Sequence, residues 1–309
     1  MAEATPPQGE ARAPGMDHPH HPFRALPDAP RFAWPDGARI ALTVTLVLDY
    51  WEVNPPAEAN RDPRIFSPLG NFFPDWLTWS RREYGARVGA FRALDLLDRF
   101  GLQPSVALGA AAARRYPELV DEMLMRGAAV MAHGTFATRR ITAKMTEAEE
   151  RALIAEARET ITSVTGAAPS GWCGQDFNES PRTPALLAEA GFTYTTDWAN
   201  DDRPFLLGPY DGGKALVALP PQPEWNDLEC LWLRHVHPQS WADAIADGFA
   251  FLHREGGGAF NLTLHPFVAG QAHHIGYLRQ ALTRILGMGA TWRTTTDELA
   301  ATARSQLAA

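Results

Sequence analysis

The sequence predicts an α/β fold in which the strands of a parallel sheet alternate with helices. The first observation behind this is the run at residues 39–48, Arg-Ile-Ala-Leu-Thr-Val-Thr-Leu-Val-Leu, which contains no Gly or Pro. A strand without a polar face is typical of a parallel sheet that is covered on both sides. The second observation is that helical patterns lie between most of the later strand candidates. This alternation is compatible with a barrel and with an open sheet.

The expected elements follow one another along the chain. After residues 39–48, the strand candidates are 105–108, 128–132, 169–173, 192–196, 215–219, 259–264 and 290–292. A helix is expected over 84–100, where Val88, Phe91, Leu94 and Leu97 have helical spacing. Start and stop signals delimit four further helices. The first begins with a capping box at Thr146 and Glu149 and ends at Gly166, and the second begins at Thr183 before Pro184 and ends at Gly191. The third begins at Ser240 and ends at Gly256, and the last begins at Thr294, with Asp297 in its first turn.

The chain is expected to be one domain, residues 34–309, behind a flexible N-terminal tail, residues 1–33. The tail is rich in Pro, Ala, Gly and His, and its histidines, His18, His20 and His21, could bind a metal or have no specific role, as is usual in such leaders. Residues 51–82 follow the first strand and predict a packed lid or pocket wall. The aromatic residues behind this prediction are Trp51, Phe66, Phe72, Phe73, Trp76 and Trp79.

Composition and charge exclude several classes of partner. The chain has 28 Lys and Arg against 36 Asp and Glu, a net charge of −8, and no basic cluster. We therefore expect no nucleic-acid or membrane partner, and a small-molecule substrate instead; homo-oligomers are left open. Two cysteines are too few for a disulfide framework or a Cys-rich zinc site. The longest apolar run falls far short of the ~20 residues of a membrane span, and no signal peptide is recognisable, so we expect a cytoplasmic protein.

Polar side chains follow five of the predicted strands at their carboxyl ends, where parallel β/α folds bind ligands. They are Asp49 and Glu52, His133, Gln175 and Asp176, Asp197, and His265. Each of these residues could instead have a structural role, such as capping a turn or hydrogen-bonding the backbone of a loop. Cys173 and Cys230 are expected in the core, and His235, His237, His273 and His274 at packing or surface positions.

Six short motifs in this order resemble the polysaccharide deacetylase (NodB-homology) superfamily. They are Asp49-Tyr-Trp-Glu52, Tyr84-Gly-Ala-Arg-Val-Gly89, Ala132-His-Gly134, Gly171-Trp172, Asp197-Trp-Ala-Asn-Asp-Asp202 and Leu262-Thr-Leu-His-Pro266. The likeness runs from about residue 35 to 300 and is greatest to the allantoinase-like and cyclic-imide-hydrolase-like branch. It implies a distorted (β/α) barrel of about seven parallel strands and hydrolysis of a carbon–nitrogen bond that is not a peptide.

The resemblance also indicates which residues could bind a metal ion. Metal-dependent relatives hold a divalent cation with an Asp after the first strand and two His spaced four apart. Asp49 and His133 match the first two positions, but position 137 is Ala. Catalytic zinc usually has three protein ligands, so Glu52, His265 or Asp176 would have to complete the site. We therefore leave open either no metal or a divalent cation such as Zn²⁺.

The leading hypothesis is an amidohydrolase for a small amide, ureide or cyclic imide. Asp49, helped by Glu52, would activate water, His133 would orient the substrate or hold a metal, and His265 would protonate the leaving nitrogen. The remaining expected substrate contacts are Arg87 and Arg139 for a carboxylate or carbonyl, Trp51, Trp172 and Trp198 as pocket walls, and Asp176 and Asp197. The alternatives are a metal-dependent deacetylase of N-acetylated sugars and an inactive binding protein on the same scaffold.

Overall fold

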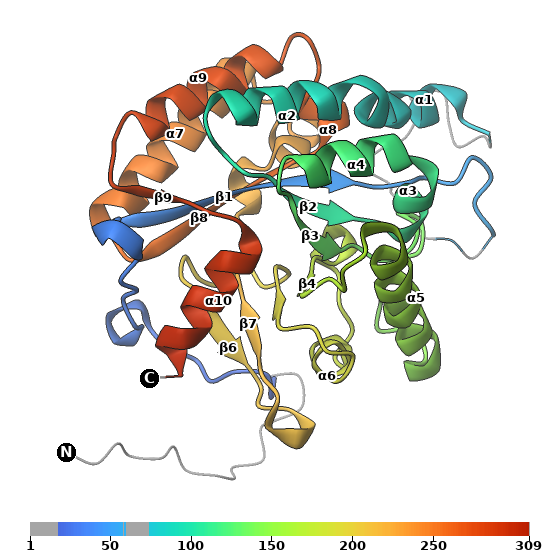
Figure 1. Ribbon diagram of the computed structural model, residues 1–309, viewed down its shortest axis with the longest axis horizontal. Helices are drawn as coiled ribbons and strands as arrows, with labels where there is room; N and C mark the ends of the chain where they lie inside the picture. Colours follow the sequence, from blue (N-terminus) through green and yellow to red (C-terminus); the bar gives the residue numbers. More distant parts are fainter. Residues whose placement is uncertain (1–17, 58, 60–73, 309) are drawn as a thin grey trace.

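A mostly parallel sheet forms the centre of the molecule in the computed structural model, which describes residues 18–57, 59 and 74–308 (Figure 1). Within these residues the strand order is β6-β7-β5-β4-β3-β2-β1-β8, and β9 pairs with β1. All neighbours are parallel except β6 and β7. The strands are β1 (Ile40–Leu48), β2 (Ser105–Leu108), β3 (Ala129–Ala132), β4 (Gly171–Trp172), β5 (Tyr194–Thr195), β6 (Phe205–Leu207), β7 (Leu216–Ala218), β8 (Gly258–Leu264) and β9 (Thr291–Arg293).

The predicted distorted barrel with about seven parallel strands is confirmed: β7, β5, β4, β3, β2, β1 and β8 form the parallel series. The prediction missed β6, a three-residue antiparallel edge strand. The two ends of the series do not pair with each other, so the sheet is a half-barrel. At the open seam the Gln222 side chain accepts from Asn261 N (2.8 Å) and donates to Ala259 O (3.0 Å). One side-chain amide thus replaces a missing strand neighbour of β8.

Helices surround the sheet, from α7 and α9 through α2 and α4 to α5 (Figure 1). They are α1 (Trp76–Tyr84), α2 (Ala90–Arg99), α3 (Ala110–Arg115), α4 (Pro117–Met125), α5 (Glu147–Thr165), α6 (Thr183–Glu189), α7 (Pro238–Glu255), α8 (Pro266–Ala269), α9 (Ile275–Leu286) and α10 (Thr296–Leu307). Short 3-10 turns are η1 (Leu26–Asp28), η2 (Pro35–Gly37), η4 (Gln175–Phe177), η5 (Asp211–Gly213) and η6 (Pro223–Trp225), and π-helical turns are η3 (Gly85–Gly89) and η7 (Leu228–Leu233).

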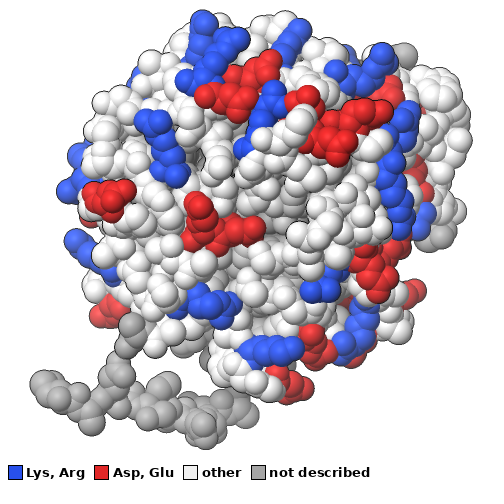
Figure 2. Space-filling view, viewed as in Figure 1, with Lys and Arg blue, Asp and Glu red and all other residues white. Residues whose placement is uncertain are grey.

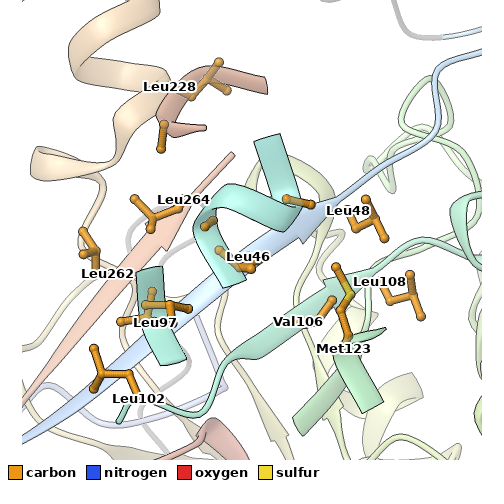
Figure 3. Packing of buried hydrophobic residues seen from close by; sticks show 14 of the residues in the cluster. Leu46, Leu48, Leu97, Leu102, Val106, Leu108, Met123, Leu228, Leu262 and Leu264 are labelled. Carbon is orange, nitrogen blue, oxygen red and sulfur yellow. The ribbon is translucent and has the colours of Figure 1, made fainter. Parts of the chain in front are cut away.

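The core lies on both faces of β1, whose nine residues are all buried. Its even-numbered residues, such as Leu46 and Leu48, pack among helix and sheet residues that include Leu97, Val106 and Met123 (Figure 3). Its odd-numbered residues Ala41 and Val47 belong to a second cluster on the opposite face. The period of two along a strand produces this division, and it explains why the run at 40–48 has no polar face.

The helix expected over 84–100 is interrupted by the π-helical turn η3, which joins α1 to α2. Its glycines allow close contact with the segment that follows β8. A Cβ on Gly89 would lie 2.0 Å from Pro266 O, and one on Gly85 would lie 2.7 Å from Phe267 N. The missing side chains therefore let this helix hold the backbone directly after His265.

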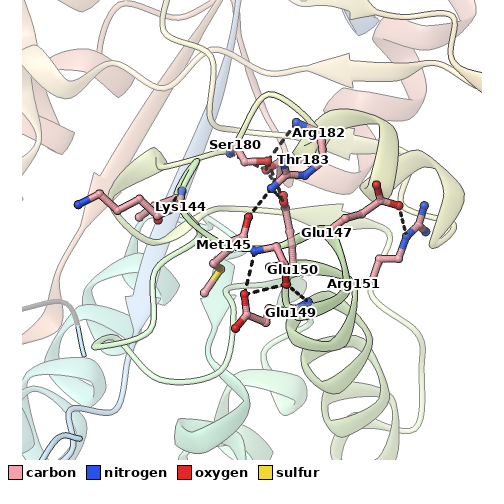
Figure 4. Close-up of polar contacts among 11 residues, drawn as sticks. Lys144, Met145, Glu147, Glu149, Glu150, Arg151, Ser180, Arg182 and Thr183 are labelled. Carbon is pink, nitrogen blue, oxygen red and sulfur yellow. Dashed lines mark hydrogen bonds and ion pairs between the residues drawn. The ribbon is translucent and has the colours of Figure 1, made fainter. Parts of the chain in front are cut away.

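Helix α5 begins with the predicted capping box and ends at Gly166 in the left-handed conformation, φ 76°. Figure 4 shows Glu147, Glu149 and Glu150 of its first turn. Helix α6 begins one residue earlier than predicted, with Arg182 rather than Thr183 as its N-cap. The Thr183 hydroxyl instead donates to Glu150, a fully buried carboxylate that also accepts from Ser180 Oγ (2.7 Å) and Arg182 Nη2 (3.2 Å). Predicted starts at Ser240 and Thr294 are also shifted, to Pro238 and Thr296.

Part of the predicted tail packs on the domain. His20 is buried and Phe32 stacks on Trp34 at 4.9 Å. The expectations for residues 1–17 and for Phe66, Phe72 and Phe73 lie outside the described residues. Lys and Arg side chains are interspersed with Asp and Glu over the face seen in Figure 2. A search of the described helices finds none with the length and apolar character of a membrane span.

Candidate active site

Asp49 and His133 lie at the carboxyl ends of β1 and β3. The parallel register of β1, β2 and β3 brings these ends together, and the His133 N–H continues the ladder by donating to Leu108 O (3.0 Å). His133 Nε2 is 3.3 Å from Asp49 Oδ1, and its Nδ1–H donates to Cys173 O at 2.6 Å. The contact with a carbonyl fixes Nδ1 as a donor, so Nε2 is the nitrogen that faces Asp49.

Each member of this pair stabilises the charged form of the other. Burial would raise the pKa of Asp49, but the neighbouring His133 lowers it below its ordinary value. Burial would lower the pKa of His133, but Asp49 and the Cys173 carbonyl raise it well above its ordinary value. The interaction between the two groups therefore favours the carboxylate form of Asp49 and the imidazolium form of His133.

His265 follows β8 and is held by a buried acid, Asp227. His265 Nδ1 lies 2.8 Å from Asp227 Oδ1. Asp227 is fully buried and also accepts the backbone N–H groups of His265, Ala269 and Leu228 at 2.9 to 3.0 Å. These contacts fix the carboxylate, which in turn fixes the imidazole with Nδ1–H toward Asp227 and leaves Nε2 for other contacts.

A small pocket of about 100 Å³ brings the three predicted catalytic side chains together. Asp49, His133 and His265 all line it. Of the other predicted residues, Trp51 and Asp176 also line it. Further lining residues include Cys173, Phe177, Asn226, Glu229 and Phe267. The site therefore has two histidines and a central carboxylate in an aromatic enclosure.

Asp176 reaches the pocket through an unusual backbone turn. Both Asp176 (φ 54°) and Phe177 (φ 55°) have left-handed conformations, which cost energy for residues other than glycine. The Asp176 side chain is paired with Arg140. This turn places a carboxylate and an aromatic ring beside the pocket.

Three predicted site residues lie outside the pocket lining. Glu52 pairs with Arg139 (2.8 Å) and accepts from the Thr138 hydroxyl, so it braces the loop after β1. Arg87 is 73% exposed and lies 3.9 Å from Glu83. Because these side chains are turned toward other partners, the structure does not bring Glu52, Arg87 or Arg139 to Asp49.

Trp172, Trp198 and Asp197 also lie outside the pocket lining. Trp172 is buried in the core against Phe192, with their rings 5.5 Å apart. The Trp198 ring instead contacts the rings of His18, His20 and His21. Asp197 is buried and accepts from Gly174 N at 2.6 Å. Of the three predicted Trp walls, Trp51 alone is among the residues that line the described pocket.

Sequence reasoning missed two residues beside the site. Asp227 follows no predicted strand, so its position gave no signal. The Arg82 guanidinium lies 3.1 Å from the centre of the Trp51 ring and contributes to the lowered pKa of Asp49. Arg82 lies in the segment where a lid was expected, but no pattern singled it out.

The donor set does not fit the metal site that the resemblance implies. Asp49 and His133 are two ligands, and Ala137 takes the place of the second histidine, with its N–H bonded to Tyr50 O (3.1 Å). The His, Cys, Asp and Glu side chains of the described residues form no group of three that could hold a metal ion. We derive no catalytic step through a metal.

Comparison with known proteins supports the resemblance. Residues 82–195 match the model of the polysaccharide deacetylase family. A candidate polysaccharide deacetylase from Mycobacterium smegmatis is 25% identical, with a TM-score of 0.75 over 90% of this chain and 94% of that one. A candidate polysaccharide deacetylase from Pseudomonas aeruginosa PAO1 is 24% identical, with a TM-score of 0.80 over 89% and 94%.

A third solved structure, PuuE allantoinase, is 24% identical, with a TM-score of 0.79 over 90% of this chain and 94% of that one. No protein of a curated collection matches the sequence significantly. These matches confirm the predicted fold and the resemblance to the polysaccharide deacetylase superfamily.

Proposed function

We propose that this chain is a hydrolase of carbon–nitrogen bonds other than peptide bonds and that its substrate is a small cyclic ureide or imide. The match of residues 82–195 to the polysaccharide deacetylase family and the similarity to a candidate polysaccharide deacetylase support the reaction class. The observation that carries this proposal is the small pocket in which Asp49, His133 and His265 converge without a third metal ligand among the described residues. A space of about 100 Å³ suits a small planar ring better than a polysaccharide chain. The fold shared with PuuE allantoinase agrees with a ureide ring.

Hydrolysis of the ring begins with attack of water on a carbonyl carbon. In the proposed mechanism Asp49 holds this water and accepts its proton as the carbon–oxygen bond forms. A carboxylate with a lowered pKa is a weak base, so its main contribution is to orient the water.

The oxygen of the attacked carbonyl becomes an oxyanion. In the proposed mechanism the positive charge of the His133 imidazolium stabilises this oxyanion. The ring is held by Cys173 O at Nδ1, and its Nε2 lies 3.3 Å from Asp49 Oδ1. A cation held in place before the reaction needs no reorganisation as the charge develops.

Collapse of the tetrahedral intermediate breaks the ring carbon–nitrogen bond, and the leaving nitrogen needs a proton. His265 donates it from Nε2, because Nδ1–H is engaged by Asp227. The proton taken up by Asp49 returns to solvent or to His265 before the next cycle. The products are a carboxylate and a free amide or ureido nitrogen.

The test is turnover on a panel of ring substrates: allantoin, hydantoins, dihydropyrimidines and succinimides, with chitooligosaccharides as the comparison. We expect ring opening of at least one cyclic substrate and no release of acetate. Activity that survives chelation would agree with the two-ligand donor set. Acetate release from chitooligosaccharides would replace the proposal with a deacetylase, and binding without turnover would replace it with an inactive binding protein.

A further inference from the structure

A second cavity, of about 510 Å³, lies apart from the candidate active site. It is lined by side chains from residues 18–30 of the N-terminal segment and from residues 198–208 after β5, together with Leu307 of α10. The Gly208 N–H donates to His20 O at 2.7 Å, which ties these two segments to each other. None of the described residues lines both this cavity and the candidate active site. Its volume lies in the range of small-molecule binding sites.

Arg203 is the most deeply buried charged residue of this lining, with 5% of its surface exposed. Its Nη1 donates to a backbone carbonyl, Ala29 O, at 3.3 Å. Its Nε and Nη2 donate to no acceptor among the described residues, and no Asp or Glu side chain of these residues forms an ion pair with it. Both nitrogens keep some accessible surface. Because Arg203 lines the cavity, this surface faces the cavity.

A guanidinium buried in this way favours a bound anion. Arginine is charged at any physiological pH and is rarely buried unless it is paired. Nε and Nη2 form one edge of the planar guanidinium, and two parallel N–H groups on such an edge can bind both oxygens of a carboxylate. The Arg203 side chain therefore offers a ligand in the cavity a two-point contact for a carboxylate.

The other side chains of the cavity favour a carboxylate on a planar ring over a phosphate. Asp201 lines the cavity and accepts the Arg203 backbone N–H at 3.0 Å, so a negative charge is already near. A phosphate group, with about 1.5 to 2 negative charges, would be repelled more strongly than a carboxylate with one. The His21 ring centre lies 4.9 Å from that of Phe205 and 5.6 Å from that of Trp198, and all three rings line the cavity. Such rings pack well against an aromatic ligand.

We propose that this cavity binds a small aromatic carboxylate. The two carboxylate oxygens accept from Nε and Nη2 of Arg203, and the ring packs against Trp198 and Phe205. A ligand in this position contacts both the N-terminal segment and the loop after β5, so it stabilises the bond between Gly208 and His20. The cavity shares no lining residue with the candidate active site, and the proposal is therefore independent of the proposed function.

Isothermal titration calorimetry of the full-length protein tests the site with four probes. Benzoate has both the ring and the charge, acetate the charge alone, benzamide the ring alone, and inorganic phosphate a higher charge. We expect benzoate to bind most tightly. Arg203→Met should weaken benzoate binding about tenfold or more, as the loss of hydrogen bonds to a charged group does. Arg203→Lys should retain only part of the affinity, because an ammonium lacks the planar edge.

Arg39→Met is the matched control. The Arg39 guanidinium also bonds backbone carbonyls, His253 O at 2.8 Å and Arg254 O at 2.5 Å, but Arg39 does not line the cavity. Its affinity for benzoate should equal that of the wild type, and circular dichroism should show that all variants are folded. In a second measurement, benzoate should slow hydrogen exchange at the Gly208 amide in the wild type but not in Arg203→Met.

Three results would overturn the proposal. They are no binding of benzoate to the wild type, equal affinity of benzoate for the wild type and Arg203→Met, and binding of acetate, benzamide or phosphate at least as tight as that of benzoate. Turnover of a cyclic substrate plays no part in these measurements. A failure of the proposed function therefore leaves them unaffected, and a failure of benzoate binding leaves the proposed function unaffected.

Discussion

At the residue scale, His265 and Asp227 form the acid–base unit on which the proposed mechanism depends. We expect His265→Ala and Asp49→Asn each to lower kcat about 10²–10⁴-fold, the range of a lost general acid or base. Asp227→Asn should lower kcat as well, because an amide NH₂ in place of Oδ1 would turn the imidazole of His265. Steady-state kinetics on the cyclic substrate measure each effect.

The control for these variants is His253→Ala. His253 lies on α7 and bonds a backbone carbonyl, Gly289 O, at 3.1 Å, away from the pocket. Its kcat should match the wild type, and circular dichroism should show that all variants are folded. Wild-type turnover in both His265→Ala and Asp49→Asn would remove the assignment.

The raised pKa of Glu179 predicts a pH dependence of stability. In the folded protein burial and Asp197 raise the pKa of Glu179 to about 9, so the folded state binds a proton that the unfolded state releases above its ordinary pKa. Wild-type stability therefore falls as pH rises from about 4.5 toward 9, by at most about 1.4 kcal/mol per pH unit from this group. An amide does not titrate in this range, so the Glu179→Gln variant should gain stability relative to the wild type as pH rises.

Urea unfolding of both proteins at pH 5, 6, 7 and 8 checks this sign. The titratable neighbours that bear on Glu179 are Asp197 and Glu150, both unchanged in the variant. A difference in unfolding free energy that stays constant across these pH values would show that Glu179 titrates normally in the folded protein.

At the element scale, the π-helical turn η3 controls where the segment after β8 lies. Gly89→Ala would place a methyl group 2.0 Å from Pro266 O, so the helix or the backbone after His265 must move. We expect a loss of about 1–3 kcal/mol in unfolding free energy, as for other overpacked sites. We also expect a lower kcat, because His265 precedes Pro266.

Gly276→Ala is the control for the Gly89→Ala substitution. Gly276 lies in α9, and nothing among the described residues lies within 4 Å of an added Cβ. Because Ala is the better helix former, this variant should keep or raise stability. Equal thermal stability and kcat in Gly89→Ala and the wild type would show that η3 does not constrain the site.

At the scale of the whole molecule, local patterns predicted every described strand except β6, and the strand-end residues Asp49, His133 and His265. Parallel strands carry their ligand-binding groups at one edge, so a position in the sequence implies a position in space. Asp227 could not be found this way, since it lies 38 residues before His265 and meets it only through tertiary packing. Trp172 and Trp198 were expected to wall the pocket, but neither lines it. The reason is the same, because the direction of a side chain depends on its neighbours in space.

The open seam of the half-barrel gives the last prediction. Gln222 bonds Asn261 N and Ala259 O, both on a strand that is buried along its whole length. Gln222→Leu would keep the apolar part of the side chain and leave a buried N–H and C=O without these partners. Each such group costs about 1–3 kcal/mol, so we expect a marked loss of stability. Hydrogen exchange at the Asn261 amide should become faster in the same variant.

Gln239→Leu provides the comparison, because the Gln239 amide bonds Asp243 on the partly exposed face of α7. It should change stability by less than about 0.5 kcal/mol, as surface substitutions usually do. If Gln222→Leu were equally mild and Asn261 exchange unchanged, the seam would be held by packing alone. If it is as costly as expected, the Gln222 side chain stabilises the seam that strand pairing leaves open in the sheet carrying Asp49, His133 and His265, together with the bond from Ala259 N to Asp202 O.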